Sequence, residues 1–133
     1  MIRTLALAVA LVAAATACAS ASSQPRTHLR IAVFPNGLHT TPVERYTLSC
    51  GPTGGTVPKP AAACRTLARL PHPFAPVPKD EICAQIVLGP QQAIVHGVLR
   101  GRRIWARLSL VTSCQIDRWH QVSSVVPGSR VSR

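Results

Sequence analysis

The chain has 133 residues and a formal net charge of +11, from 15 Lys and Arg against four Asp and Glu. That length leaves room for one domain of ordinary size. The four acids form no convincing pair for general acid and base catalysis, and the chain lacks Gly-x-Ser-x-Gly, phosphate-loop and Cys-x-x-Cys motifs. We therefore expect a single domain that is not an enzyme.

The N-terminal residues predict a secretory signal peptide. One cation, Arg3, precedes an apolar run at residues 5–15, and small residues follow, which is the layout of such signals. The run is shorter than the about 20 residues that a membrane-spanning helix needs. We expect the signal to occupy residues 1–21, with cleavage after Ala17 or Ala21, and the mature chain to be secreted.

Cys18 lies at the cleavage region and is the odd one among five cysteines. It either leaves with the signal or becomes the first residue of a lipid-anchored protein, because Ala15-Thr16-Ala17-Cys18 is a loose version of the bacterial lipoprotein box. In both cases four cysteines remain for the domain: Cys50, Cys64, Cys83 and Cys114. Disulfides persist in exported proteins, and four cysteines allow three pairings.

Two strands and a helix are predicted in the first half of the domain. Residues 28–33 alternate between apolar and polar or small side chains, and Pro35-Asn36-Gly37 ends this strand pattern. Residues 45–50 alternate in the same way. Residues 61–70 are the best helix candidate, and Pro60 suits the first turn of that helix.

The second half begins with a connector that cannot be regular structure, because residues 71–78 contain four prolines. Two further strands are predicted at residues 93–99 and 104–111, joined as a hairpin at Arg100-Gly101-Arg102. Residues 114–120 are expected to form a short helix.

Six short segments carry a relationship to known proteins. They are Tyr46-Thr47-Leu48-Ser49-Cys50, Ala63-Cys64-Arg65-Thr66-Leu67-Ala68, Glu81-Ile82-Cys83, Gly89-Pro90, Val98-Leu99-Arg100-Gly101-Arg102-Arg103 and Cys114-Gln115-Ile116-Asp117-Arg118-Trp119. In order and spacing they resemble the Streptomyces subtilisin inhibitor-like family of secreted actinobacterial proteins. We accordingly expect the domain at residues 28–121, followed by a flexible tail at 122–133.

The resemblance implies a fold and a disulfide pairing. The fold is α+β, a two-layer sandwich of about five antiparallel strands with two helices on one face, often dimeric through the sheet. The pairing is sequential, with Cys50 joined to Cys64 and Cys83 joined to Cys114.

The resemblance also implies substrate-like inhibition of subtilisin-type serine proteases. In that family the bond offered to the protease lies two residues after the third disulfide cysteine, which here is the bond between Gln85 and Ile86. The reactive loop would consist of Cys83, Ala84, Gln85, Ile86 and Val87. An extended loop adds backbone hydrogen bonds to an enzyme's cleft, and a loop already held in its bound conformation avoids an ordering cost. The partner would be an extracellular subtilisin-like or trypsin-like protease.

The excess of positive charge suggests a second kind of partner. Arg100, Arg102, Arg103 and Arg107 cluster around the predicted hairpin, either as an ordinary solvated surface or as a site for an anionic envelope surface. The alternative function is therefore a non-inhibitory, basic envelope-binding module on the same scaffold. We expect no nucleic-acid partner for an exported chain. The scattered histidines lack zinc-site spacings, so we expect no metal or other cofactor.

Overall fold

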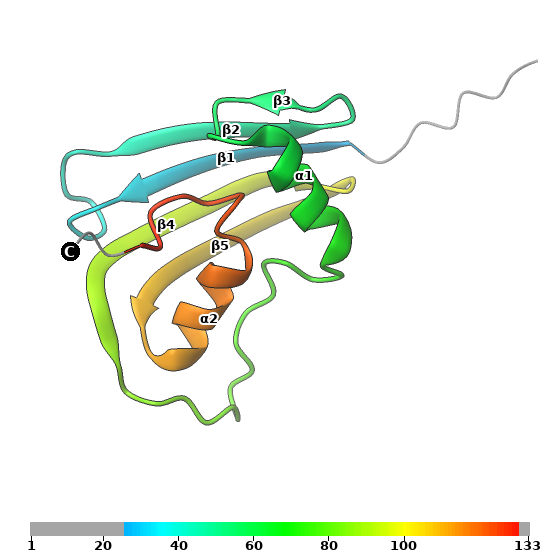
Figure 1. The fold of residues 1–133 in the computed structure, drawn as a ribbon. Coiled ribbons are helices and arrows are strands. Elements are labelled where there is room, and N and C mark those ends of the chain that lie inside the picture. Colours follow the sequence, from blue (N-terminus) through cyan, green and yellow to red (C-terminus); the bar gives the residue numbers. More distant parts are fainter. Residues whose placement is uncertain (1–25, 131–133) are drawn as a thin grey trace, which may run out of the picture.

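The computed structural model describes residues 26–130, which form a five-stranded antiparallel sheet with two helices against one face (Figure 1). The elements in chain order are β1 (Thr27–Phe34), β2 (Glu44–Cys50), β3 (Gly54–Gly55), α1 (Pro60–Arg69), β4 (Val87–Leu99), β5 (Arg102–Val111) and α2 (Ser113–Gln121). Their order across the sheet is β3-β2-β1-β4-β5. The expected two-layer α+β fold is confirmed.

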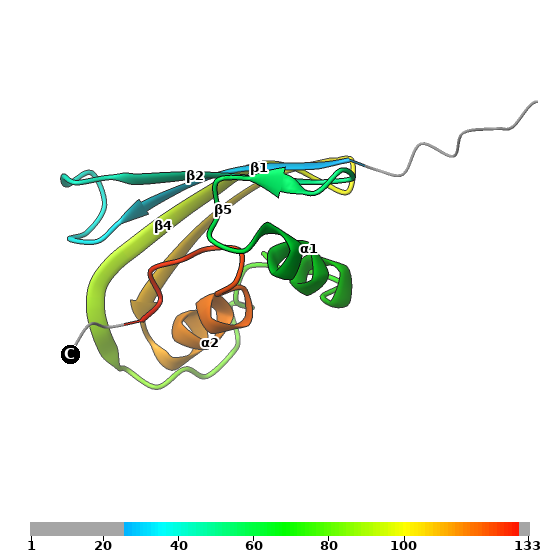
Figure 2. The ribbon, with the colours of Figure 1, turned by 45° about the horizontal axis from the view of Figure 1, so that its top comes forward.

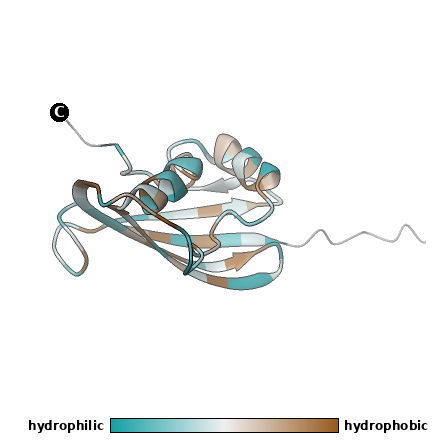
Figure 3. Ribbon diagram, turned by 90° about the horizontal axis from the view of Figure 1, so that it is seen from below, coloured by the Kyte–Doolittle hydropathy of each residue, from teal (hydrophilic) through white to brown (hydrophobic). Residues whose placement is uncertain are grey.

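Alternation along the strands decides which face of the sheet is buried. In β1 the residues Leu29, Ile31 and Val33 are almost completely buried, while between them Arg30 is exposed and Ala32 is half-buried. The strands of Figure 3 are accordingly banded between apolar and polar residues. Ile31 pairs with Tyr46 of β2 and with Val95 of β4, so the apolar rows of neighbouring strands share one face. Both helices cover that face, and the other is bare (Figure 2).

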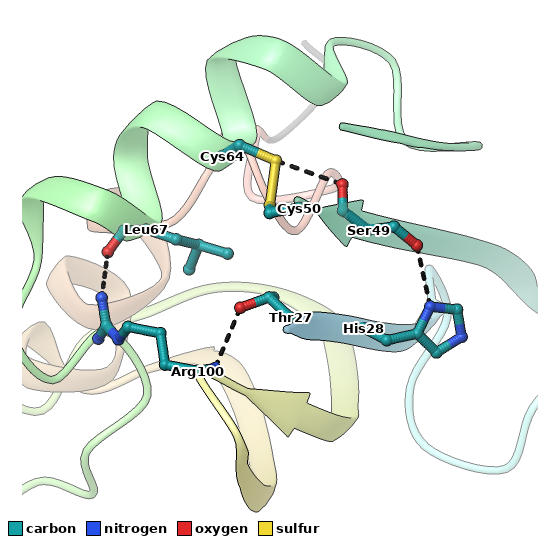
Figure 4. Close-up of a disulfide and its surroundings, with 7 residues drawn as sticks. All are labelled: Thr27, His28, Ser49, Cys50, Cys64, Leu67 and Arg100. Atoms are coloured by element: carbon teal, nitrogen blue, oxygen red, sulfur yellow. Dashed lines mark hydrogen bonds between the residues drawn. A yellow bond between two sulfur atoms is a disulfide. The ribbon is translucent and has the colours of Figure 1, made fainter. Parts of the chain in front are cut away.

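Helix α1 begins at Pro60, as expected, and packs on the sheet through Ala63, Thr66 and Leu67. Ala68, directly after Leu67, is exposed. A disulfide joins Cys64 of this helix to Cys50 at the end of β2, with a Cα–Cα distance of 5.8 Å (Figure 4).

Arg100 in the β4–β5 turn caps the other end of α1. Its guanidinium donates a hydrogen bond to the Leu67 carbonyl oxygen at 2.7 Å, and its backbone N–H donates to Thr27 Oγ1 at 3.0 Å (Figure 4). The guanidinium also donates to the carbonyl oxygens of Leu70 and Pro71 at 3.1 and 3.0 Å. These carbonyls at the helix C-terminus lack helical partners. Arg100 is exposed, and these hydrogen bonds also give it a structural role.

The expectation of a flexible tail is wrong for residues 122–130. Val122, Val125 and Val126 are fully buried, and the indole N–H of the fully buried Trp119 donates to the Val126 carbonyl oxygen at 2.9 Å. A buried indole needs such an acceptor, so the segment after α2 returns to complete the core. Residues 131–133 lie outside the described part.

One strand boundary and one additional strand also differ from the expectations. Strand β4 begins at Val87 rather than near residue 93, with an irregular register between Val87 and Gln92. Strand β3 consists of two glycines, which give no alternation signal.

The predicted signal segment and Cys18 lie outside the described residues. Within residues 26–130 no helix is long and apolar enough to cross a bilayer.

Candidate functional site: the loop after Cys83

The loop between the connector and β4 is fixed at its start by a disulfide. Cys83 is bonded to Cys114 in the first turn of α2, with a Cα–Cα distance of 5.5 Å. With the bond between Cys50 and Cys64, this confirms the sequential pairing. The loop lies at the end of the molecule away from the bare face of the sheet, where Figure 2 shows the green connector passing beneath α2 into β4.

The side chains of the loop project into solvent. Ala84 and Gln85 are exposed, and the exposed fractions of Ile82, Ile86 and Val87 are 97%, 43% and 71%. Such a run of large apolar side chains on the surface is typical of a protein-binding segment.

The backbone of this exposed loop is nevertheless tied to the start of α2. The Ala84 N–H donates to Ser113 Oγ at 2.9 Å, and the Ser113 N–H donates to the Ala84 carbonyl oxygen at 3.0 Å. The Thr112 N–H donates to the Ile86 carbonyl oxygen at 2.7 Å. Since Val87 pairs with Val111, these bonds extend the β4–β5 pairing beyond the strand ends.

Gln85 stands between the two tied residues and faces the other way. Successive residues of an extended chain point their backbone groups to opposite sides. Neither the backbone N–H nor the carbonyl oxygen of Gln85 has a hydrogen-bond partner within the described residues. Its side chain and its backbone are thus both available to a partner, while its neighbours are fixed.

Thr112 adjusts the chain between β5 and α2 so that these bonds can form. It has φ 70° and ψ 147°, a conformation that is strained for a β-branched residue, and its side chain accepts a hydrogen bond from the Gln115 N–H as the helix N-cap. Such strain persists only where the surroundings hold it. The bond to Ile86, the cap and the neighbouring disulfide supply that constraint.

A half-buried arginine holds the connector that leads into the loop. The Arg118 guanidinium donates to the carbonyl oxygens of Phe74, Ala75 and Arg107 at 2.9, 2.8 and 2.7 Å. Burial lowers the pKa of this guanidinium, whose ordinary value is high enough that it stays charged. The loop is therefore anchored on its connector side as well as through Cys83.

Sequence reasoning proposed residues 83–87 as the site but did not identify the contacts that hold them. A Thr-Ser pair directly before a helix is a capping signal, so Thr112 could have been recognised as an N-cap. The contact of Ser113 with Ala84 spans 29 residues, and no local pattern indicates it. Among residues 26–130, no three His, Cys, Asp or Glu side chains gather where they could hold a metal ion.

Comparison with known proteins identifies the family of the chain. Residues 24–109 match the family described as subtilisin inhibitor-like. The chain is 35% identical over 79 residues to subtilisin inhibitor-like protein 5 of Streptomyces fradiae, a match that covers 58% of this chain and 74% of the relative. The chain belongs to the subtilisin inhibitor-like family.

Proposed function

We propose that this protein is a secreted inhibitor of subtilisin-type serine proteases, which offers residues 83–87 as a substrate mimic with the bond between Gln85 and Ile86 at the enzyme's nucleophile. Family membership supports the class of activity. The observation that carries the assignment of the site is the free, exposed backbone of Gln85 between Ala84 and Ile86, which are both held by the segment before α2.

The anchored loop would make cleavage reversible. Attack by the enzyme's serine oxygen on the Gln85 carbonyl carbon forms an acyl-enzyme and releases the Ile86 amine. The acyl side stays in place through the bonds of Ala84 and the Cys83 disulfide, and the amine side through the bond from Thr112 to Ile86. An amine held beside the ester has a high effective concentration, so its attack reseals the peptide bond and restores the serine in competition with hydrolysis.

The residues of the loop favour an enzyme with an uncharged pocket. Gln85 carries no positive charge for a carboxylate at the base of a trypsin-like pocket, whereas its neutral side chain can enter an open, uncharged one. The exposed side chains of Ile82, Ile86 and Val87 add apolar surface on both sides of the bond. We therefore place a subtilisin-like enzyme ahead of a trypsin-like one as the target.

The envelope-binding alternative does not require an exposed and ordered loop. A module that acts only through its basic surface gains nothing from a loop that is exposed and fixed at both ends. The hydrogen bonds of Ala84 and Ile86 therefore favour an inhibitor over that alternative.

The test is a titration of the purified, oxidised mature protein against fixed amounts of subtilisin and of trypsin. We expect a stoichiometric loss of subtilisin activity and a weaker effect on trypsin. Intact mass measured after incubation reports whether the loop has been cut, and circular dichroism reports whether the protein is folded. If the folded protein inhibits neither enzyme at micromolar concentration, the proposal is wrong.

A further inference from the structure

A hollow of about 400 Å³ lies between the start of α1 and the segment that follows α2. Its lining includes two cations, Lys59 and Arg130, and three serines, Ser123, Ser124 and Ser129, but no acidic residue. Figure 2 shows the red segment after α2 passing the green start of α1, on the helix side of the sheet. The proposed reactive loop contributes no residue to this hollow, so the two are separate features of the molecule.

The start of α1 adds positive potential at the hollow. Lys59 is the N-cap residue, but its side chain makes no capping hydrogen bond, and the first turn contains no acidic residue. The N–H groups of Ala61 and Ala62 have no acceptor within residues 26–130, as expected where a helix begins. Free N–H groups and the helix dipole favour an anion at such an end. A helix start alone does not make a site, and the second wall of the hollow supplies the further element.

That element is Ser129. The residue is only 5% exposed and lines the hollow, so the little surface that it keeps faces this space. Its hydroxyl has no hydrogen-bond partner in the part of the chain that the structure describes. A buried hydroxyl without a partner is unfavourable. A ligand that accepts its hydrogen inside the hollow would remove this penalty.

The second wall is held in place by the core and by α1. The Ser124 hydroxyl donates to Thr66 Oγ1 of α1 at 2.7 Å, which joins the two walls. Gly128 has a φ of +97°, and a Cβ atom at this position would lie 2.9 Å from Val33 Cγ1. Glycine therefore allows the chain to run close to the core directly before Ser129. The hollow is thus preformed, and a ligand would not have to order it on binding.

We propose that this hollow binds a phosphate group, with Lys59 and Arg130 as its counter-charges and the Ser129 hydroxyl as a hydrogen-bond donor. A phosphate monoester carries about −1.5 to −2 charges at neutral pH and offers three oxygens as acceptors, which suits two cations and a hydroxyl. Guanidinium groups recognise phosphate through paired hydrogen bonds. A cationic or apolar ligand would leave the charges and the hydroxyl unpaired. Free phosphate and a phosphate ester share this chemistry, and the experiment distinguishes them.

Isothermal titration calorimetry of the mature protein, residues 22–133, tests the proposal at constant ionic strength. The probes are inorganic phosphate, glycerol 3-phosphate and acetate. We expect saturable one-to-one binding of the two phosphates and none of acetate. Tighter binding of glycerol 3-phosphate would assign the site to an ester, and tighter binding of inorganic phosphate would assign it to the free ion. Phosphate should also raise the unfolding midpoint, because a ligand that binds only the folded protein stabilises it.

Variants at the two walls locate the contact. Lys59→Gln should weaken phosphate binding about fivefold, which is the upper range for an exposed ion pair. Lys79→Gln removes the same charge from an exposed position outside the hollow and should change binding less than about twofold, since salt screens distant charges. Ser129→Ala should weaken binding about tenfold, as expected for a hydrogen bond to a charged group. In phosphate-free buffer this variant should unfold at the midpoint of the wild type or above it, because the hydroxyl that it loses had no partner.

Three results would overturn the proposal. The first is a lack of saturable binding at millimolar phosphate. The second is an equal loss of affinity in Lys59→Gln and Lys79→Gln, which would show attraction by overall charge. The third is a lower midpoint for Ser129→Ala in phosphate-free buffer with an unchanged affinity for phosphate, which would show that the hydroxyl serves the fold. None of these results bears on the inhibition of subtilisin, because residues 83–87 lie outside the hollow.

Discussion

Ser113 holds Ala84 through two hydrogen bonds, one donated by its backbone N–H and one accepted by its hydroxyl. In a regular antiparallel pair both bonds would come from backbone groups. Here the chain turns into α2 at Ser113, and its hydroxyl takes the place of the missing carbonyl. One side chain thus continues the sheet pairing to Ala84, the residue before Gln85 of the proposed reactive bond.

Removal of that hydroxyl should loosen the loop without damage to the fold. Ser113→Ala leaves the Ala84 N–H without its acceptor, at a cost of about 1 kcal/mol. The loop is then less ordered in the free protein, so its ordering on binding reduces the affinity for the protease. We expect weaker inhibition of subtilisin and faster cleavage between Gln85 and Ile86. Inhibition constants and intact mass over time measure the two effects. Ser123→Ala at an exposed position is the control. Equal inhibition constants and cleavage rates for the two variants would show that Ser113 does not position the loop.

The side chain at position 85 should set the specificity. Buried central residues carry most of the energy of an interface, so Gln85→Lys should create or strengthen inhibition of trypsin, and Gln85→Met should favour subtilisin. An exposed loop substitution usually changes stability by less than about 0.5 kcal/mol, so both variants should fold normally. Gln121→Lys at the exposed end of α2 is the matched control. If the wild type and both loop variants are equally inert toward the two enzymes while folded, the inhibitor proposal fails and the envelope module becomes the better account.

The sequence predicted the parts of the fold whose side chains repeat with a clear period. Leu29, Ile31 and Val33 marked β1 and its buried face, and Pro60 marked the start of α1. The tail was missed because Val125 and Val126 lie in a short stretch with no period. Only the finished core, with an indole that needs an acceptor, explains why these valines are buried.

The proposed reactive loop was predicted from the resemblance, and the contacts that hold it required the structure. The disulfide pairing fixes where the loop starts, but the bonds from Thr112 and Ser113 depend on how β5 turns into α2. The hydrogen bonds of Arg100 could not be foreseen for a related reason. Its place in a basic run indicated a solvated residue, and it is exposed, but only the geometry of the turn shows that its guanidinium also reaches the end of α1.

The segment after α2 should contribute to the stability of the domain. Val126→Ala removes buried methyl groups next to Trp119 and should lower the free energy of unfolding by about 2 kcal/mol. Arg130→Ala at an exposed position should change it by less than about 0.5 kcal/mol. Guanidinium unfolding followed by Trp fluorescence compares the two. Equal midpoints for both variants would restore the flexible-tail interpretation.

The two disulfides should separate stability from inhibition. In the chain-entropy model the bridge from Cys50 to Cys64, with a sequence separation of 14, contributes about 3 kcal/mol, and the bridge from Cys83 to Cys114, with a separation of 31, contributes slightly more. Replacement of either pair by serine should therefore lower the unfolding midpoint by a similar amount.

Of the two bridges, only the one between Cys83 and Cys114 retains the loop after cleavage. Under conditions where both variants are folded, Cys50→Ser with Cys64→Ser should still inhibit subtilisin, whereas Cys83→Ser with Cys114→Ser should be consumed as a substrate. Retained inhibition by the second variant, with its loop uncut, would show that the hydrogen bonds of Ala84 and Ile86 suffice and that the disulfide serves stability alone.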